Sequence, residues 1–263
     1  SKKDSEADEY NALCKELNEA LKARNPEYLL TAAIPGGAEG YKRFDLKECS
    51  KYLDFIHIMT YDLEASAKVY HHAALYSNLG KGTATNASAN DSVELFNLQG
   101  VPKEKLVIGI AFYGKWTKPS KTTDGGLGSD SANGKYTTLT YYTIKNHYLN
   151  RVGKGVTEYW DSTCFAPYLY DADNNYFITY ENERSIKEKA KYVRQKTYIT
   201  MEKGEYHITC AGMTDAMKET TIKTYKNHVF DIFAKGFEIG GKLIPKHVKG
   251  GIVLYETTFK IRS

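Results

Sequence analysis

The sequence lacks the features that mark membrane-spanning, nucleic-acid-binding and disordered chains. No apolar run approaches the length of about 18 residues that can span a bilayer. The polar start at residues 1–6 is not followed by an apolar stretch that could serve as a signal peptide. The 36 Lys and Arg residues exceed the 32 Asp and Glu residues only slightly, and neither sign forms a long block. With 41% hydrophobic residues, the chain is too apolar for disorder. We therefore expect a folded domain with no nucleic-acid partner and no membrane span.

The sequence has no two cysteines close together, whereas zinc sites and redox motifs require such pairs. The four cysteines stand far apart, so isolated buried thiols are the expectation, and a disulfide between Cys14 and Cys49 stays open. His71 and His72 are adjacent, and neighbouring side chains in an extended segment point apart. No carboxylate stands at ligand spacing from them in the sequence, which favours a role in a loop. We therefore predict no metal site and no cofactor.

Tyrosine is the one residue type in clear excess: 22 Tyr stand beside 10 Phe and 2 Trp. Its ring is flat and apolar and carries a hydroxyl, which suits both half-buried strands and sugar-binding clefts. A general bias of the source genome toward lysine and tyrosine would explain most of these tyrosines without any functional role. At 263 residues, the chain is long enough for one large domain or two small ones.

The first 115 residues alternate between helical and strand patterns. Residues 4–24 carry apolar side chains at the i, i+3, i+4, i+7 spacing of an amphipathic helix. Short continuous apolar runs then predict strands that are buried on both faces. These strands are expected at residues 29–34, 55–61 and 105–113, and helices are expected between them at 46–53 and 92–99. Such an order predicts parallel β/α units.

The pattern changes after residue 115. Short runs with strand character predict an antiparallel sheet inserted between two β/α units; they lie at 136–140, 156–160, 167–170 and 176–180.

The last part of the chain begins with a helix expected at residues 185–196, with Ser185 as its cap. Residues 197–245 mix a strand-like segment, 206–209, with a helix-like one, 221–235. The apolar run at 250–256 predicts a final buried strand.

Five segments follow one another in an order that is specific for one family. They are residues 52–63 (YLDFIHIMTYDL), 71–76, 106–115, 160–170 and 250–256. In this order they resemble the sixth strand, the loop after it, the seventh strand, the α+β insertion and the eighth strand of the glycoside hydrolase family 18 chitinases and chitinase-like lectins. The resemblance implies a TIM-type β/α barrel, of which this chain carries strands five to eight, with an α+β subdomain inserted between strands seven and eight.

On this interpretation, residues 1–263 form part of one family 18 catalytic-type domain. Residues 1–115 supply β/α units, and about 116–184 supply the insertion. Residues 185–263 supply a helix, an insert that the resemblance does not place, and the final strand.

The chain also departs from the family pattern. The D-x-x-D-x-D-x-E run, which ends the family's fourth strand and supplies the acid, does not occur. The family's Trp on the eighth strand is replaced by Tyr255, and the Arg that usually follows the seventh strand is replaced by Lys115. Residues 197–245 form a stretch that the family normally lacks.

Hydrolysis in this family is substrate-assisted: the acetamido oxygen of the sugar attacks the anomeric carbon. The protein must protonate the leaving group and hold the acetamido group with fixed dipoles. By resemblance, the catalytic residues of this chain are Tyr61 and Asp62, and its substrate-binding residues are Met59, Tyr113, Tyr255 and Trp160. Without the resemblance, Met59 and Tyr61 would be core residues and Asp62 would cap a loop. Glu64 and Glu256 lie near strand ends but outside the family's acid motif, so each is expected to be a loop carboxylate.

These observations favour an enzyme that hydrolyses β-1,4-linked N-acetylglucosamine polymers and whose acid lies outside this chain, so that the chain alone is predicted to be inactive. The alternative is a chitin-binding lectin of the same family or a surface-coat protein. Half a barrel exposes two sheet edges, so the expected partners are the missing amino-terminal half-barrel, as another chain or segment, or a second copy, besides chitin or its oligosaccharides. The resemblance alone implies an extracellular or cell-surface location.

Overall fold

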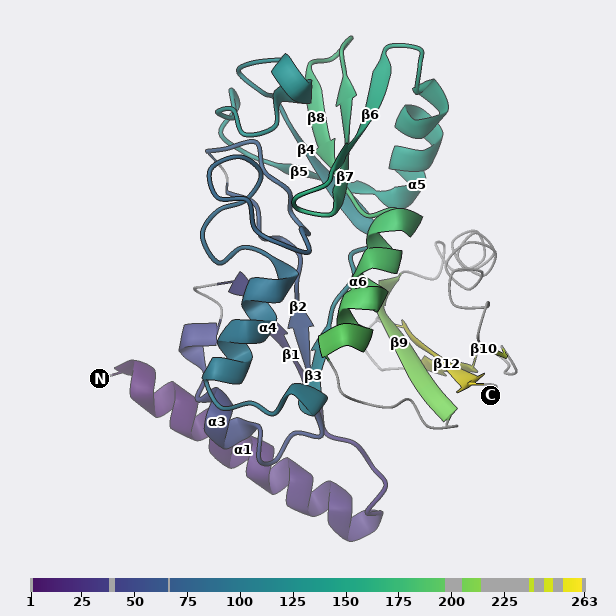
Figure 1. Ribbon diagram of the computed structural model, residues 1–263. Coiled ribbons are helices and arrows are strands. Elements are labelled where there is room, and N and C mark those ends of the chain that lie inside the picture. Colours follow the sequence, from purple (N-terminus) through teal and green to yellow (C-terminus); the bar gives the residue numbers. More distant parts are fainter. Residues whose placement is uncertain are drawn as a thin grey trace. The chain divides into compact units, whose positions relative to one another are not determined.

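The computed structural model describes residues 2–37, 41–65, 67–196, 205–213, 237–238, 244–247 and 253–261 (Figure 1). The chain divides into two compact units, Ser1–Lys189 and Ala190–Ser263. Among the described residues, no helix is both long and apolar enough to cross a membrane.

The first unit begins with the predicted parallel β/α units. Its three-stranded sheet has the order β1-β2-β3, and both pairings are parallel. The strands are β1 (Thr31–Pro35), β2 (Phe55–Met59) and β3 (Leu106–Ile108). The helices are α1 (Lys2–Arg24), α3 (Leu46–Cys49) and α4 (Ala89–Leu98). Side-chain oxygens cap two of them: Asp45 accepts the backbone N–H of Glu48 at α3, and Ser88 accepts that of Asp91 at α4.

The two faces of this sheet differ in burial. Ile34, Ile56 and Ile58 point to one face and are fully buried. Phe55 and Val107 point to the other face and are 37% and 36% exposed. The prediction of burial on both faces is therefore wrong for one face. Three strands form an open sheet, and among the described residues the structure has no closed barrel that would enclose that face.

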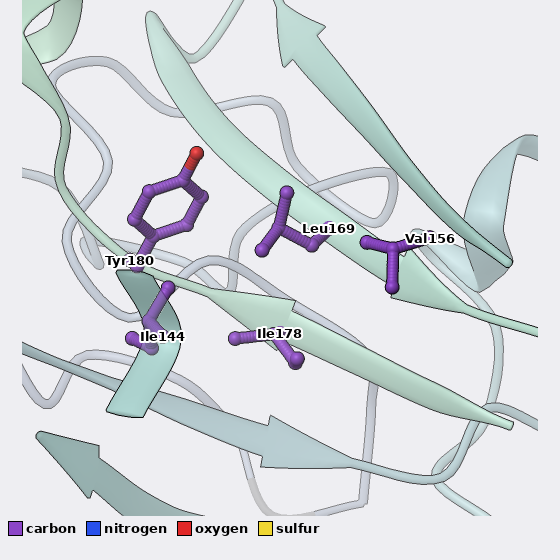
Figure 2. Packing of buried hydrophobic residues seen from close by; sticks show 5 residues of the cluster. All are labelled: Ile144, Val156, Leu169, Ile178 and Tyr180. Carbon is purple, nitrogen blue, oxygen red and sulfur yellow. The ribbon is translucent and has the colours of Figure 1, made fainter. Parts of the chain in front are cut away.

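A five-stranded antiparallel sheet follows, as predicted. Its order is β5-β4-β8-β7-β6. The strands are β4 (Tyr113–Thr117), β5 (Thr137–Thr140), β6 (Val156–Asp161), β7 (Ala166–Asp171) and β8 (Tyr176–Thr179). Helix α5 (Tyr141–Thr143) continues into a π-helical turn, Ile144–Tyr148. Figure 2 shows the core on one face of this sheet, where buried side chains gather: Ile144, Val156, Leu169, Ile178 and Tyr180.

The apolar run at 105–113 does not form one strand. It ends as β3 at Ile108, and Tyr113 already belongs to β4 of the antiparallel sheet, so the insertion begins before residue 116. The chain passes close to the end of β2 at Gly109, whose N–H donates to the Ile58 carbonyl over 2.8 Å. A Cβ on Gly109 would lie 2.8 Å from the Tyr61 ring. This close approach redirects the chain and delivers Tyr113 next to the end of β2.

Helix α6 (Glu183–Lys196) confirms the helix expected at 185–196. The prediction of Ser185 as its cap is wrong, because the helix begins at Glu183 and the Asn182 side chain accepts the backbone N–H of Ser185. The described residues also contain short 3₁₀ turns at Tyr41–Arg43, Lys103–Lys105, Thr123–Gly126 and Leu149–Arg151.

The second unit contains an antiparallel sheet of β9 (Glu205–Met213), β10 (Phe237–Glu238), β11 (Ile244–His247) and β12 (Val253–Ile261). The strand-like segment at 206–209 lies in β9, whereas the helix-like segment at 221–235 lies outside the described residues. The strand predicted at 250–256 exists as β12, but it does not continue the parallel sheet. Tyr255 pairs with Cys210 on one side and Pro245 on the other. Because both edges of β12 have antiparallel partners, the described residues do not form the expected eighth barrel strand.

Candidate functional site

Several of the predicted site residues lie close together at the carboxyl end of β2. Met59 is the last residue of β2, and Tyr61 and Asp62 follow directly. Met59 follows His57 by two positions and Phe55 by four, so the three side chains lie on the same face of the sheet, the face that is not fully buried. Tyr113 and Lys115 reach the same place from β4. Polar groups therefore gather at the carboxyl ends of parallel strands, where β/α folds build their sites.

Asp62 is held in an unusual backbone conformation. Its φ angle is 60°, in the left-handed region that few residues other than Gly adopt. The Lys115 ammonium lies 2.8 Å from Asp62 Oδ1, and His72 Nδ1 lies 3.9 Å from the same atom. The side chain of Tyr113 lies close enough to this carboxyl group to lower its pKa. The Asp62 side chain is nevertheless 48% exposed, so a ligand can reach a carboxylate that the protein has already oriented.

The charge of Asp62 follows from these contacts. Partial burial raises its pKa, but the interactions with His72, Lys115 and Tyr113 outweigh burial and hold the pKa well below its usual range. Burial also raises the pKa of Tyr113, and the Asp62 carboxylate adds to the shift. At neutral pH Asp62 is therefore an anion, and Tyr113 keeps its proton.

Glu64 joins the site although the sequence analysis treated it as a loop carboxylate. Its Oε1 lies 2.5 Å from Lys115 Nζ, and its side chain is only 10% exposed. Glu64 Oε2 is buried and has no hydrogen-bond partner among the described residues. Burial lowers the pKa of Lys115, but its bonds to Asp62 and Glu64 outweigh that effect and raise it. Lys115 is thus a cation fixed between two carboxylates. Lys115 and Glu64 are 51 positions apart, so no local pattern links them. The only sequence signals for this pair are that Lys115 follows an apolar run and stands where the family usually has Arg.

Aromatic rings border the carboxylate. The rings of Tyr61 and Tyr113 meet edge to face, with centroids 5.9 Å apart. The buried ring of His72 lies 5.5 Å from that of Tyr113. Neither ring nitrogen of His72 has a hydrogen-bond partner among the described residues. The structure thus places Tyr61, Asp62 and Tyr113 next to one another, and their assignment as catalytic and substrate-binding residues stays a prediction.

The remaining predicted site residues lie elsewhere in the chain. Trp160 is on β6, where the Arg184 guanidinium lies over its ring at 3.9 Å. Tyr255 is in β12 of the second unit, and only its backbone pairing is described. Their assignment as substrate-binding residues stays a prediction.

The two adjacent histidines do have carboxylate neighbours in space, contrary to the expectation drawn from their spacing. His71 Nε2 lies 3.1 Å from Asp161 Oδ2, 90 positions away, while His72 faces Asp62. The two rings point apart, as expected of neighbours in an extended segment.

Comparison with known proteins identifies similar sequences and structures. Residues 1–200 match the sequence profile of the glycosyl hydrolases family 18. Chitinase A1 of Niallia circulans is 30% identical over 216 residues, which cover 74% of this chain and 30% of that protein. The endochitinase of Manduca sexta is 31% identical over 214 residues, which cover 74% of this chain and 38% of that protein.

A solved structure agrees with these matches. It is that of a family 18 N-acetylglucosaminidase from Paenibacillus barengoltzii, which is 33% identical, with a TM-score of 0.63, over 71% of this chain and 55% of that one. The present chain thus spans about a third of the length of the two curated relatives. Because the family profile covers 200 of the 263 residues, and the residues gathered around Asp62 fall within it, this chain belongs to glycosyl hydrolase family 18.

Proposed function

We propose that this chain supplies the acetamido-binding side of the active site of a chitinase that acts on β-1,4-linked N-acetylglucosamine. The observation that carries the proposal is the half-exposed carboxylate of Asp62, which Lys115 and Tyr113 orient beside the Tyr61 ring. The named relatives are chitinases, which supports this substrate class.

The proposed chemistry is substrate-assisted. The acetamido oxygen attacks the anomeric carbon, the bond to the leaving oxygen breaks, and that oxygen takes a proton from a general acid. The developing positive charge on the oxazolinium ring is stabilised by the Asp62 anion, while the Tyr61 hydroxyl donates to the acetamido group. Lys115 and Tyr113 act as positioning residues, because each contacts Asp62.

The proton donor must come from outside this chain, since the D-x-x-D-x-D-x-E run does not occur in it. We place it on an amino-terminal half-barrel, either as another chain or segment, that covers the open face of β1 to β3. The exposure of Phe55 and Val107 on that face supports this partner. The chain alone should not hydrolyse a fluorogenic chitobioside, because general acid catalysis is worth about 10² to 10⁴ in rate. Secretion or cell-surface display belongs to the same proposal and rests on the family resemblance.

The test is Asp62→Asn in the full-length protein, with Asp130→Asn as the matched control. Asp130 also pairs with a lysine, Lys68, but its side chain is 70% exposed and lies on a loop of the insertion. Asp62→Asn should lower kcat by about 10² or more, because it removes a preorganised electrostatic partner of the transition state. The Kd for chitotetraose should change far less, and Asp130→Asn should change neither value.

A lectin is the second candidate, favoured by the replacement of the family's Trp by Tyr255. In that case wild type would show no turnover, and Asp62→Asn would weaken chitotetraose binding. Unchanged turnover and unchanged affinity in Asp62→Asn would show that Asp62 only caps a loop, and the proposal would be wrong.

A further inference from the structure

A second cluster of polar side chains lies apart from Asp62, where the segment after β2 meets the turn between β6 and β7. It contains one ligand atom each from His71, Asp161 and Cys164, and these atoms all lie within 4.8 Å of one another. His71 and Cys164 are fully buried, and the Asp161 side chain is only 9% exposed. Imidazole nitrogen, carboxylate oxygen and thiol sulfur are the three atom types that bind zinc in proteins.

The backbone fixes the three side chains in place. Asp161 Oδ1 accepts the N–H groups of Thr163 and Cys164 over 2.8 and 3.0 Å, which leaves Oδ2 to face His71. The backbone N–H of His71 donates to the Gly82 carbonyl over 2.9 Å. His71 Nδ1 has no hydrogen-bond partner among the described residues. Nε2 lies 3.1 Å from Asp161 Oδ2, so an ion bound by both atoms would replace the proton between them, and the unpartnered Nδ1 can carry that proton instead.

Gly82 lies directly against the three side chains. A Cβ on this residue would lie 3.0 Å from Asp161 Oδ2, 3.0 Å from Cys164 Sγ and 3.3 Å from His71 Cδ2. The φ angle of Gly82 is not in the left-handed region, so backbone conformation does not explain the glycine. A larger residue at this position would crowd the three ligand atoms.

The cluster also lacks a fixed cation. A comparable group of possible ligands, formed by Asp62, Glu64 and His72, surrounds the Lys115 ammonium. Within the part of the chain that the structure describes, Asp161 has no Lys or Arg in ion-pair contact, and the imidazole of His71 is its neighbour instead. A carboxylate that is only 9% exposed and has no Lys or Arg partner is a group whose charge a bound cation would compensate.

We propose that His71, Asp161 and Cys164 bind one Zn²⁺ ion. Neutral imidazole, carboxylate and thiolate together balance its two positive charges, and a water molecule completes the tetrahedron. The mixed S, N and O ligands suit zinc better than Mg²⁺ or Ca²⁺, which prefer oxygen. The Cys164 thiol loses its proton to solvent when the Zn–S bond forms, and no electron is transferred. The ion would link the segment after β2, which also carries His72, to the β6–β7 turn.

The experiment uses the full chain after removal of metals with a chelator. Co²⁺ replaces Zn²⁺ as a coloured probe, because a cobalt–thiolate bond gives a charge-transfer absorption in the near ultraviolet. We expect one Co²⁺ per chain with this absorption, its displacement by Zn²⁺, and a higher Tm when Zn²⁺ is added. A variant in which Cys14, Cys49 and Cys210 are replaced by Ser should keep all three properties.

Two variants separate the site from general effects on folding. Cys164→Ser should abolish the charge-transfer absorption. Gly82→Ala keeps every ligand but crowds Asp161 Oδ2 and Cys164 Sγ, and should weaken Co²⁺ binding by about 10- to 100-fold, the scale of changes to groups around a metal site. Absence of stoichiometric Co²⁺ binding by wild type would overturn the proposal. So would an undiminished charge-transfer absorption in Cys164→Ser, and this spectroscopic result is independent of glycosidase activity.

Discussion

Replacing Lys189 by Met should destabilise the first unit strongly, because it breaks a buried ion pair. Lys189 on α6 is fully buried, contacts Glu181 Oε1, and donates to the Ala73 carbonyl over 2.8 Å. Glu181 is 3% exposed, and its Oε2 accepts the Ser185 hydroxyl over 2.6 Å. After the substitution Glu181 keeps one hydrogen bond but loses its counter-charge, and the Ala73 carbonyl loses its donor.

The expected loss is about 3 to 5 kcal/mol in the free energy of unfolding, the range for removing one partner of a buried ion pair. With a urea m-value of about 1 to 3 kcal/mol per M, the midpoint should fall by roughly 2 M. Tryptophan fluorescence is the suitable probe, because both Trp residues of the chain, Trp116 and Trp160, lie in the first unit.

The matched control is Lys187→Met, which removes an exposed lysine from the same helix and should change the midpoint little. The double variant Glu181→Gln/Lys189→Met should recover part of the loss, because no charge is then left buried. If Lys189→Met unfolds at the same urea concentration as Lys187→Met, the ion pair contributes nothing and the reasoning fails.

Two further predictions concern groups at or beside the parallel sheet. Gly109→Ala would place a Cβ 2.8 Å from the Tyr61 ring and 2.9 Å from the Ile58 backbone oxygen, so we expect a loss of about 1 to 3 kcal/mol in urea unfolding; an unchanged midpoint would contradict the close approach. Cys49 is a free thiol, so the disulfide with Cys14 is not formed, and burial raises its pKa to about 12. The Cys49 thiol loses its proton near its ordinary pKa of about 8.5 in the unfolded chain, whereas the native chain keeps it. The free energy of unfolding should therefore fall as pH rises from about 8.5 toward 12. This slope should be smaller in Cys49→Ala. Iodoacetamide should modify Cys49 at pH 9 only after urea is added, and rapid modification of the native chain would show that the thiol is accessible.

The sequence by itself determined the local elements of the first unit and the family. Periodicity and short apolar runs predicted α1, β1, β2 and α6, because the spacing of apolar residues reports which side of an element is covered. The motif around Tyr61 and Asp62 predicted that polar groups gather after β2, since a strand end and its following residues are neighbours in the chain. These features depend on residues a few positions apart, which a sequence displays directly.

Only the tertiary structure decided which distant segments meet. The Lys115–Glu64 pair joins residues 51 positions apart, and the His71–Asp161 pair joins residues 90 apart. No periodicity encodes such contacts, because they depend on how loops close and which sheet each strand joins. For the same reason the apolar run at 105–113 predicts one strand, whereas the structure divides it between two sheets at the closely packed Gly109. The apolar character of β12 likewise predicts a strand but not its antiparallel partners. An extended apolar segment can pair with any unpaired strand edge that lies beside it in the folded chain.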